Sequence, residues 1–256
     1  MIWIATAALL LSRAVVPAGP AAAHNGVTVD PDGLRITTGQ CNGDELTVRL
    51  TNTGRKAIYA DASLSAPAEL HLPRTLISTW LPPRYTSSVP VPVRATDGAR
   101  PGTYHVRVSS RGRTADVPVT VTDPPASADL VRSAARVTVS SARADAAACN
   151  AIDGNPVSMW IDATGKRWPD WWRVDWAAAR RVSRVAVTTT AQWGLRDWDV
   201  QVAEGQRWVT VASVRDNTAV EHVSQFAERR TRSVRIVTRA GNQVNDVSRL
   251  VEVVIR

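Results

Sequence analysis

The sequence predicts an all-β protein made of two β-sandwiches in tandem. Short segments of alternating apolar and polar residues recur along 27–122 and again along 129–256, and period-two alternation is typical of half-buried strands. Turn-forming residues separate the segments, and no amphipathic helical pattern of convincing length interrupts them. A proline-rich stretch between the two runs divides the chain into two units of ordinary domain size.

The first predicted domain covers residues 24–122. Roughly seven strands in about 95 residues are typical of an immunoglobulin-like sandwich. The segments 46–54 (LTVRLTNTG), 65–67 (SAP) and 99–104 (ARPGTY) also make this half similar to the immunoglobulin-like domain attached to bacterial α-galactosidases and other glycosidases. That resemblance implies a spacer or accessory role.

Two further segments complete the predicted domain organisation. Residues 123–128 (DPPASA) contain two prolines, which stiffen an exposed connection, so we expect a linker there and the second domain at 129–256. Residues 1–23 have the pattern of a signal peptide, with an apolar run at 2–11 and small residues at 21–23. No Lys or Arg precedes that run, which leaves open a true start codon further upstream. Because the run is too short to span a bilayer, we expect a secreted, extracellular protein.

Charge and cysteine content narrow the function classes. The formal net charge is +8, but the basic residues are dispersed among acidic ones, which argues against a nucleic-acid partner. Cys41 and Cys149 are the only cysteines and fall in different predicted domains. A disulfide between the domains, which export permits, and a pair of unlinked thiols both remain open. Two cysteines and four scattered histidines do not suggest a zinc site.

The second half resembles the discoidin family, also called coagulation-factor C-type domains, which includes the family 32 carbohydrate-binding modules. The motifs that carry the resemblance follow in order: 137–141 (VTVSS), 150–160 (NAIDGNPVSMW), 171–175 (WWRVD), 181–187, 197–203, Trp208, Arg235 and 250–253 (LVEV). The resemblance implies a galactose-binding-like β-sandwich of jelly-roll type. The predicted strand count also favours this fold.

The loop Asp153-Gly154-Asn155 suits a calcium ion. Calcium prefers six to eight oxygen ligands, and a sharp glycine turn lets backbone carbonyls converge. The resemblance implies a structural calcium ion held by the side chains of Asp153, Ser158 and Glu252 and by main-chain oxygens of Asn150, Asn155, Ser158 and Val251. A plain Asx turn without an ion explains the same loop residues.

Eight of the ten tryptophans lie between positions 160 and 208, a density that suggests stacking on sugar rings. Most of them nevertheless have a packing explanation. Trp160, Trp171, Trp198 and Trp208 occupy the buried aromatic positions of the resembled family, so we expect them in the core. Trp176 stands where a small aliphatic residue is usual and either widens the core or reaches the surface.

Trp193 is the best candidate for ligand contact, because the loop 191–196 (AQWGLR) matches a loop that lines the ligand face in sugar-binding relatives. Arg196 would act as a charged donor beside it, and Trp168 would supply a second wall. A hydrophobic loop plug is the alternative. A second loop offers Asn242, Asn245 and Asp246 as donors and acceptors for a polyhydroxylated ligand, although turn chemistry explains the same residues.

Catalytic patterns are weak in this sequence. Asp197 and Asp199 lie on one face of a predicted strand, where alternation makes them an exposed sandwich face rather than a catalytic pair. The histidines fall in no recognisable triad. We therefore expect a non-enzyme.

The sequence thus predicts a secreted, monomeric, bacterial carbohydrate-binding protein that attaches to extracellular or cell-wall glycans through loops of its second sandwich. One alternative is an adhesion module for membrane or protein surfaces, with Trp193 and Leu195 as an apolar tip flanked by Arg196. Another is an accessory fragment of a glycoside hydrolase. The identity of the glycan does not follow from the sequence.

Overall fold

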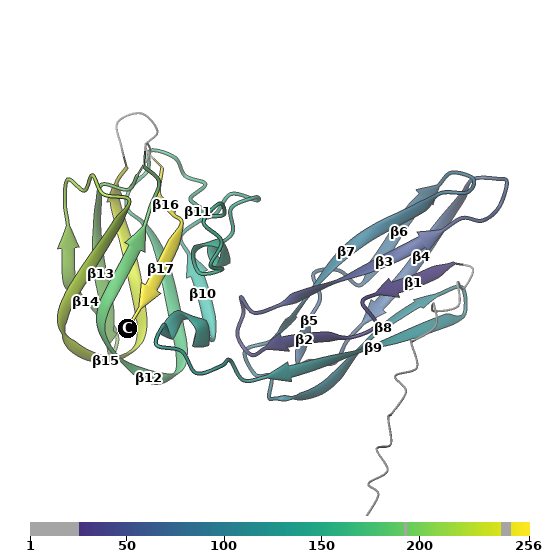
Figure 1. The fold of residues 1–256 in the computed structure, drawn as a ribbon. Coiled ribbons are helices and arrows are strands. Elements are labelled where there is room, and N and C mark those ends of the chain that lie inside the picture. The colour runs from purple at the N-terminus through teal and green to yellow at the C-terminus, as the bar shows by residue number, and fades with distance from the viewer. Residues whose placement is uncertain (1–25, 192–193, 242–246) are drawn as a thin grey trace, which may run out of the picture.

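A computed structural model describes residues 26–191, 194–241 and 247–256. This part of the chain consists of β-strands with two short 3-10 helices, so the all-β prediction is confirmed. Figure 1 shows two stacks of strands, one from each half of the chain. In the described residues, no helix combines the length and the hydropathy that a membrane span requires.

The N-terminal sandwich contains two main sheets, ordered β1-β3-β7-β5 and β2-β9-β8-β4-β6. Alternation fixes its inner face: Leu46, Val48 and Leu50 of β3 are fully buried, while the residues between them point outward. Its strands are β1 Val27–Asp30, β2 Leu34–Thr37, β3 Asp44–Thr51, β4 Ile58–Ser65, β5 Leu70–His71, β6 Leu76–Leu81, β7 Thr86–Ala95, β8 Gly102–Ser110 and β9 Arg113–Thr122. The immunoglobulin-like identity of this sandwich stays a prediction.

The C-terminal sandwich follows a short connection and has its own core. Its larger sheet has the order β10-β12-β15-β13-β14, β17 pairs with β12, and β11 pairs with β16. The elements are η1 Leu130–Ser133, β10 Arg136–Val139, η2 Ala148–Ala151, β11 Trp160–Ile161, β12 Asp170–Thr188, β13 Asp197–Glu204, β14 Arg207–Val214, β15 Glu221–Ala240, β16 Arg249–Leu250 and β17 Glu252–Ile255.

Two long strands, β12 and β15, join the layers of this sandwich. Their antiparallel register breaks between Asp175 and Arg180 of β12. Before the break, β12 also pairs with β10, and after it β12 pairs with β17. Such irregularities let a strand bend and contribute to two layers. We call the layer made by β10, the first part of β12, the last part of β15, β13 and β14 the front sheet.

The tryptophan predictions are partly wrong. Trp160 and Trp198 are fully buried as expected, and so is Trp172, while Trp176 is 4% exposed and widens the core. Trp171 and Trp208 are instead only half-buried. Side chains alternate along a strand, so the burial of Trp172 on β12 turns Trp171 to the outer face of the front sheet.

The two sandwiches contact each other through the loop between β2 and β3. The Gln40 amide donates to the Ala135 carbonyl at 3.2 Å, and its side chain accepts a hydrogen bond from the Val137 amide at 3.0 Å. Gly39 adopts φ +111°, and a Cβ there would lie 2.6 Å from the Ala134 carbonyl oxygen. The close approach therefore requires glycine at this position.

Candidate functional site

Described segments that flank the predicted ligand residues meet at one end of the C-terminal sandwich. The Asp162 amide donates to the Ser248 carbonyl at 3.2 Å, and the Arg196 amide donates to the Ala240 carbonyl at 2.9 Å. The Asn217 amide in turn donates to the Arg196 carbonyl at 3.0 Å. We call the described segments 162–169, 194–196, 216–220 and 247–248 the loop end.

A buried polar network supports the loop end from below. Asp162 accepts hydrogen bonds from the amides of Gly165 and Ser248, at 2.8 Å and 2.6 Å. Asp170 accepts from the hydroxyls of Ser140 at 3.0 Å and Ser248 at 3.1 Å. Because hydrogen-bonded buried groups hold one geometry, this network fixes both ends of the segment 162–170.

The pKa of Asp170 reflects this burial. Removal from water raises the pKa of its carboxyl, and the neighbouring negative charge of Asp162 raises it further. Hydrogen bonds from Ser140, Ser248 and Thr164 act in the opposite direction without cancelling the effect. Both aspartates are essentially inaccessible to solvent, so they support the loops rather than contact a ligand.

Trp168 and Arg196 are the predicted ligand residues that the structure describes. Trp168 is half-buried against the core, and its indole Nε1 is buried without a hydrogen-bond partner among the described residues. Arg196 pairs with Asp216 at 3.2 Å and keeps 37% of its side chain exposed. Both side chains therefore present part of their surface at the loop end.

Leu195 corrects one expectation about this end. It is fully buried, and its amide donates to the Thr189 hydroxyl at 2.8 Å. A leucine that fills the core cannot insert into a membrane, so the apolar tip of Trp193 and Leu195 is wrong as stated. Trp193 itself lies outside the described residues, as do Asn242, Asn245 and Asp246.

The loop predicted to bind calcium brings several oxygens together. The Ser158 hydroxyl lies 2.7 Å from an Asp153 carboxylate oxygen and 3.0 Å from the Asn155 carbonyl oxygen. The Asn155 amide donates to the other Asp153 oxygen at 2.8 Å, which is the Asx turn that the alternative explanation requires. Gly154 has φ +75°, a conformation that glycine adopts without strain.

Glu252 joins this loop from β17. Its carboxylate accepts a hydrogen bond from the Gly154 amide at 3.1 Å and pairs with Arg132 at 3.4 Å. Burial raises the pKa of Glu252, against the lowering effects of the Gly154 amide and Arg132, and Asp153 adds to the increase.

The remaining predicted ligands are close in sequence to this loop or to Glu252. Asn150 lies in η2 and Val251 lies between β16 and β17. Over the described ranges, no group of three or more His, Cys, Asp and Glu side chains is arranged to hold a metal. The donor set that the resemblance implies is two carboxylates, a hydroxyl and main-chain oxygens, which is a composition that calcium accepts.

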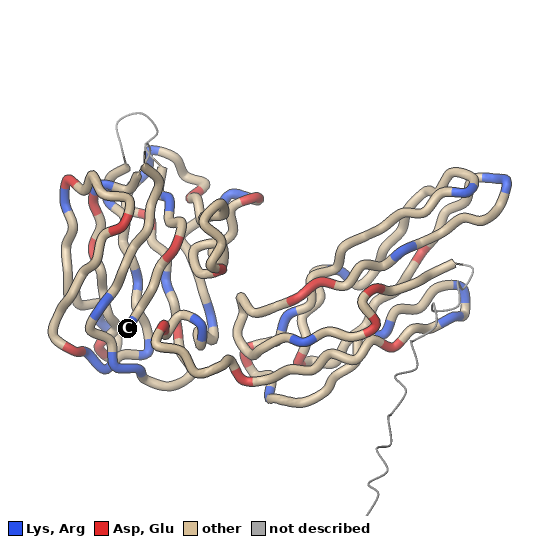
Figure 2. The backbone as a smooth tube through the Cα atoms, in the orientation of Figure 1, with Lys and Arg blue, Asp and Glu red and all other residues tan. Residues whose placement is uncertain are grey.

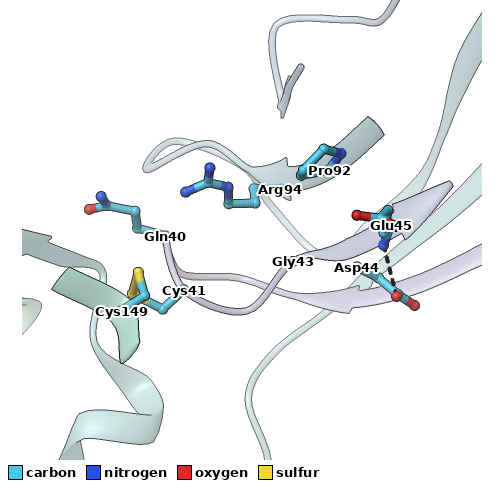
Figure 3. Close-up of a pocket in the computed structure, with 8 residues that line it drawn as sticks. All are labelled: Gln40, Cys41, Gly43, Asp44, Glu45, Pro92, Arg94 and Cys149. Atoms are coloured by element: carbon cyan, nitrogen blue, oxygen red, sulfur yellow. Dashed lines mark hydrogen bonds between the residues drawn. A yellow bond between two sulfur atoms is a disulfide. The ribbon is translucent and has the colours of Figure 1, made fainter. Parts of the chain in front are cut away.

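A hollow of about 350 Å³ lies where the sandwiches meet (Figure 3). Cys41 and Cys149 form a disulfide at one side of it, and Arg94 and Pro92 approach from β7. The hollow belongs to the junction and is made of different residues from the loop end.

The outer face of the front sheet carries a charged cluster that the sequence analysis missed. The guanidinium carbons of Arg235 and Arg173 lie 4.3 Å and 5.2 Å from the ring centroid of Trp208. Asp199 is on the same face but only 4% exposed, so its expected position on an open surface is wrong. The alternation that buries Trp172 and Val174 would have placed Trp171 and Arg173 together on this face.

Asp199 is buried by its own ion pairs. It binds Arg215 at 2.7 Å, Arg239 at 2.8 Å and the Ser213 hydroxyl at 2.8 Å. Burial acts to raise the pKa of this carboxyl, but the hydrogen bonds from the two arginines outweigh it, so the pKa of Asp199 lies below its ordinary value.

Comparison with known proteins bears on the C-terminal sandwich. Residues 150–236 match the model of a family described as the NedA-like, galactose-binding domain. The C-terminal sandwich is therefore similar to discoidin-type domains, and we refer to it as the discoidin-like domain. The match does not extend to the N-terminal sandwich, and no curated protein matches the chain.

Several solved structures are similar to the discoidin-like domain. Chitosan-binding module 1 of a chitosanase/glucanase from Paenibacillus sp. IK-5 is 22% identical, with a TM-score of 0.44, over 51% of this chain and 99% of that one. Module 2 of that enzyme, in complex with chitotriose, is 21% identical, with a TM-score of 0.43, over 47% and 94%. The family 32 CBM of NanJ from C. perfringens, in complex with galactose, is 21% identical, with a TM-score of 0.41, over 47% and 91%.

Proposed function

We propose that this protein is a secreted, non-catalytic glycan-binding protein and that its discoidin-like domain holds the sugar at the loop end. The match of residues 150–236 to a galactose-binding family carries this proposal. The meeting of the loops at one end of the sandwich supports it, because ligand sites lie preferentially on loops that a rigid scaffold positions. The disulfide between Cys41 and Cys149 supports export, since disulfides persist in oxidising compartments.

Each of the loop residues would make a different contact with the sugar. Trp193 would stack on the apolar face of the ring, with Trp168 as a second wall. Arg196, which Asp216 orients, would donate to adjacent hydroxyls. Asn242, Asn245 and Asp246 would complete the hydrogen bonds from the neighbouring loop.

We also propose a structural calcium ion in the loop 153–158. The side chains of Asp153, Ser158 and Glu252 would hold it, with main-chain oxygens of Asn150, Asn155, Ser158 and Val251. The convergence of the Asp153, Ser158 and Asn155 oxygens supports this site. Arg132 already pairs with Glu252, so the ion would share that carboxylate with a guanidinium. It would tie the start of the domain to its last strand.

The sugar site is tested by a glycan array followed by tryptophan fluorescence. We expect a glycan selected on the array to shift the emission of the parent, and we expect Trp193→Ala to abolish the shift while leaving Tm unchanged. Trp80 is the matched control, because it is a tryptophan 55% exposed on the N-terminal sandwich, and Trp80→Ala should bind as the parent does.

Three results would count against the sugar site. The first is no array signal together with binding to anionic liposomes. The second is a Trp193→Ala variant that binds normally. The third is a Trp193→Ala variant that lowers Tm sharply, which would make that residue a loop plug.

A further inference from the structure

The outer face of the front sheet has a regular layout that places arginine at its centre. Arg173 of β12 stands opposite Arg235 of β15, and Arg235 stands opposite Gln201 of β13. Trp171 of β12 lies on the neighbouring row, opposite Val237. We call the outward-facing set Trp171, Arg173, Trp208, Arg235 and Arg239 the arginine face.

The two aspartates of this surface neutralise some of its positive charge. Asp175 pairs with Arg173, and Asp199 pairs with both Arg215 and Arg239. Three guanidinium groups therefore share these two carboxylates, and the fourth, that of Arg235, pairs with neither, so the surface keeps an excess of positive charge. Figure 2 shows that acidic and basic positions are interspersed along the backbone of both sandwiches.

Arg235 is the guanidinium that no carboxylate neutralises. Across the described ranges it has no ion pair, and its one hydrogen bond is from Nε to the Gln201 side-chain oxygen at 2.7 Å. Burial lowers its pKa, and the positive charges of Arg173 and Arg239 lower it further. Its Nη groups are thus charged donors that have no anionic acceptor among the described residues.

The surroundings of Arg235 select the kind of acceptor that fits. The guanidinium packs on Trp208, whose indole is half-exposed and offers an apolar surface beside the charge. Arg173 and Arg239 keep 39% and 44% of their side chains exposed. A ligand that combines an anion with a flat apolar face would contact both features at once.

We propose that the arginine face is a second glycan-binding surface and that it binds an acidic polysaccharide, with a sugar carboxylate on Arg235 and the sugar ring against Trp208. Guanidinium and carboxylate form two parallel hydrogen bonds in a fork. Repeated carboxylates along the polymer would reach Arg173 and Arg239. The surface goes beyond the proposed function because it shares no residue with the loop end.

Binding to polygalacturonate, measured by isothermal titration at about 0.15 M salt, tests this surface. At that ionic strength charges more than about 8 Å apart are largely screened, so the measurement favours direct contacts. We expect the full exported chain to bind and Arg235→Gln to bind roughly tenfold more weakly or worse, as loss of a charged hydrogen-bonded pair implies.

The matched control is Arg232→Gln. Arg232 lies on the same strand, is exposed, and its replacement changes the net charge by the same amount. We expect less than a twofold effect. Arg235→Lys keeps the charge but loses the planar fork and should weaken binding several-fold, and it carries the test if Arg235→Gln lowers Tm.

Four results would overturn the inference: no binding to polygalacturonate by the parent, equal losses in Arg232→Gln and Arg235→Gln, normal binding by Arg235→Lys, or a comparable Arg235-dependent binding of duplex DNA. The same measurement separates this surface from the loop end. Trp193→Ala should leave polygalacturonate binding intact, so failure of either surface is distinguishable from failure of the other.

Discussion

Cys41 of the N-terminal sandwich and Cys149 of the C-terminal sandwich form a disulfide, with their Cα atoms 5.4 Å apart and a sequence separation of 108. Cys149 lies in η2, and Cys41 lies in the loop that also contains Gly39 and Gln40. The bridge therefore reinforces a junction that backbone hydrogen bonds already form. The sequence left this pairing open.

Reduction of the disulfide should lower Tm by several degrees. A bridge across a long stretch of chain restricts the unfolded ensemble, and a typical one contributes about 2–4 kcal/mol. Differential scanning calorimetry with and without reductant measures the change. The double variant Cys41→Ser, Cys149→Ser is the control, because reductant should not lower its Tm further.

The state of the thiols gives a direct check of this bridge. Alkylation of the denatured, unreduced protein should add no mass, and two adducts should form after reduction. Two adducts before reduction, together with a Tm that does not respond to reductant, would show that the bridge is absent from the mature protein.

Removal of calcium should destabilise the discoidin-like domain. A ligand that binds only the folded state at a hundred times its Kd adds about 2.7 kcal/mol, so chelator should lower Tm and added calcium should restore it. Asp153→Asn should remove the response. Asp145→Asn, an equally exposed aspartate outside the loop, should keep it. A Tm that neither chelator nor Asp153→Asn alters would leave only the Asx turn.

Asp199→Asn should lower the free energy of unfolding at pH 7, and this loss should become smaller at acidic pH. The folded-state pKa of Asp199 lies below its ordinary value of 3.8, so its stabilisation is present above about pH 4 and is lost as the pH falls through the folded-state pKa. Loss of charged hydrogen bonds to Arg215 and Arg239 implies about 1.5–3 kcal/mol at pH 7.

Denaturant unfolding at pH 7 and near pH 3 measures this difference. The gap between parent and Asp199→Asn should shrink at the lower pH. Glu228→Gln is the comparison, because its ion pair with Arg181 is exposed on both sides and should contribute about 0–1 kcal/mol. Equal costs for the two variants would mean that burial does not strengthen the Asp199 pairs.

Local sequence patterns determined the strands of this protein, many of its core residues and its division into two sandwiches. Period-two alternation identified the strands and made Leu46 and Val48 core residues, since a sandwich leaves one face of each strand dry. The resemblance to the discoidin family, and not local spacing, predicted that Asp153, Ser158 and Glu252 meet, because Glu252 arrives from the last strand. The separation into two sandwiches likewise follows from the prolines between two alternating runs.

Tertiary structure decided what depends on neighbours from other strands. Alternation assigns a side chain to a face but does not say what covers that face. Asp199 was therefore predicted to be exposed, whereas Arg215 and Arg239 cover it in the structure. Leu195 was predicted to lie at a loop tip, but it is fully buried in the core. The pairing of Cys41 with Cys149 depends on how the sandwiches dock, and the contact of Arg235 with Trp208 depends on the register of β13 between β14 and β15. Distances of this kind arise from packing between segments remote in the chain, which no local sequence pattern specifies.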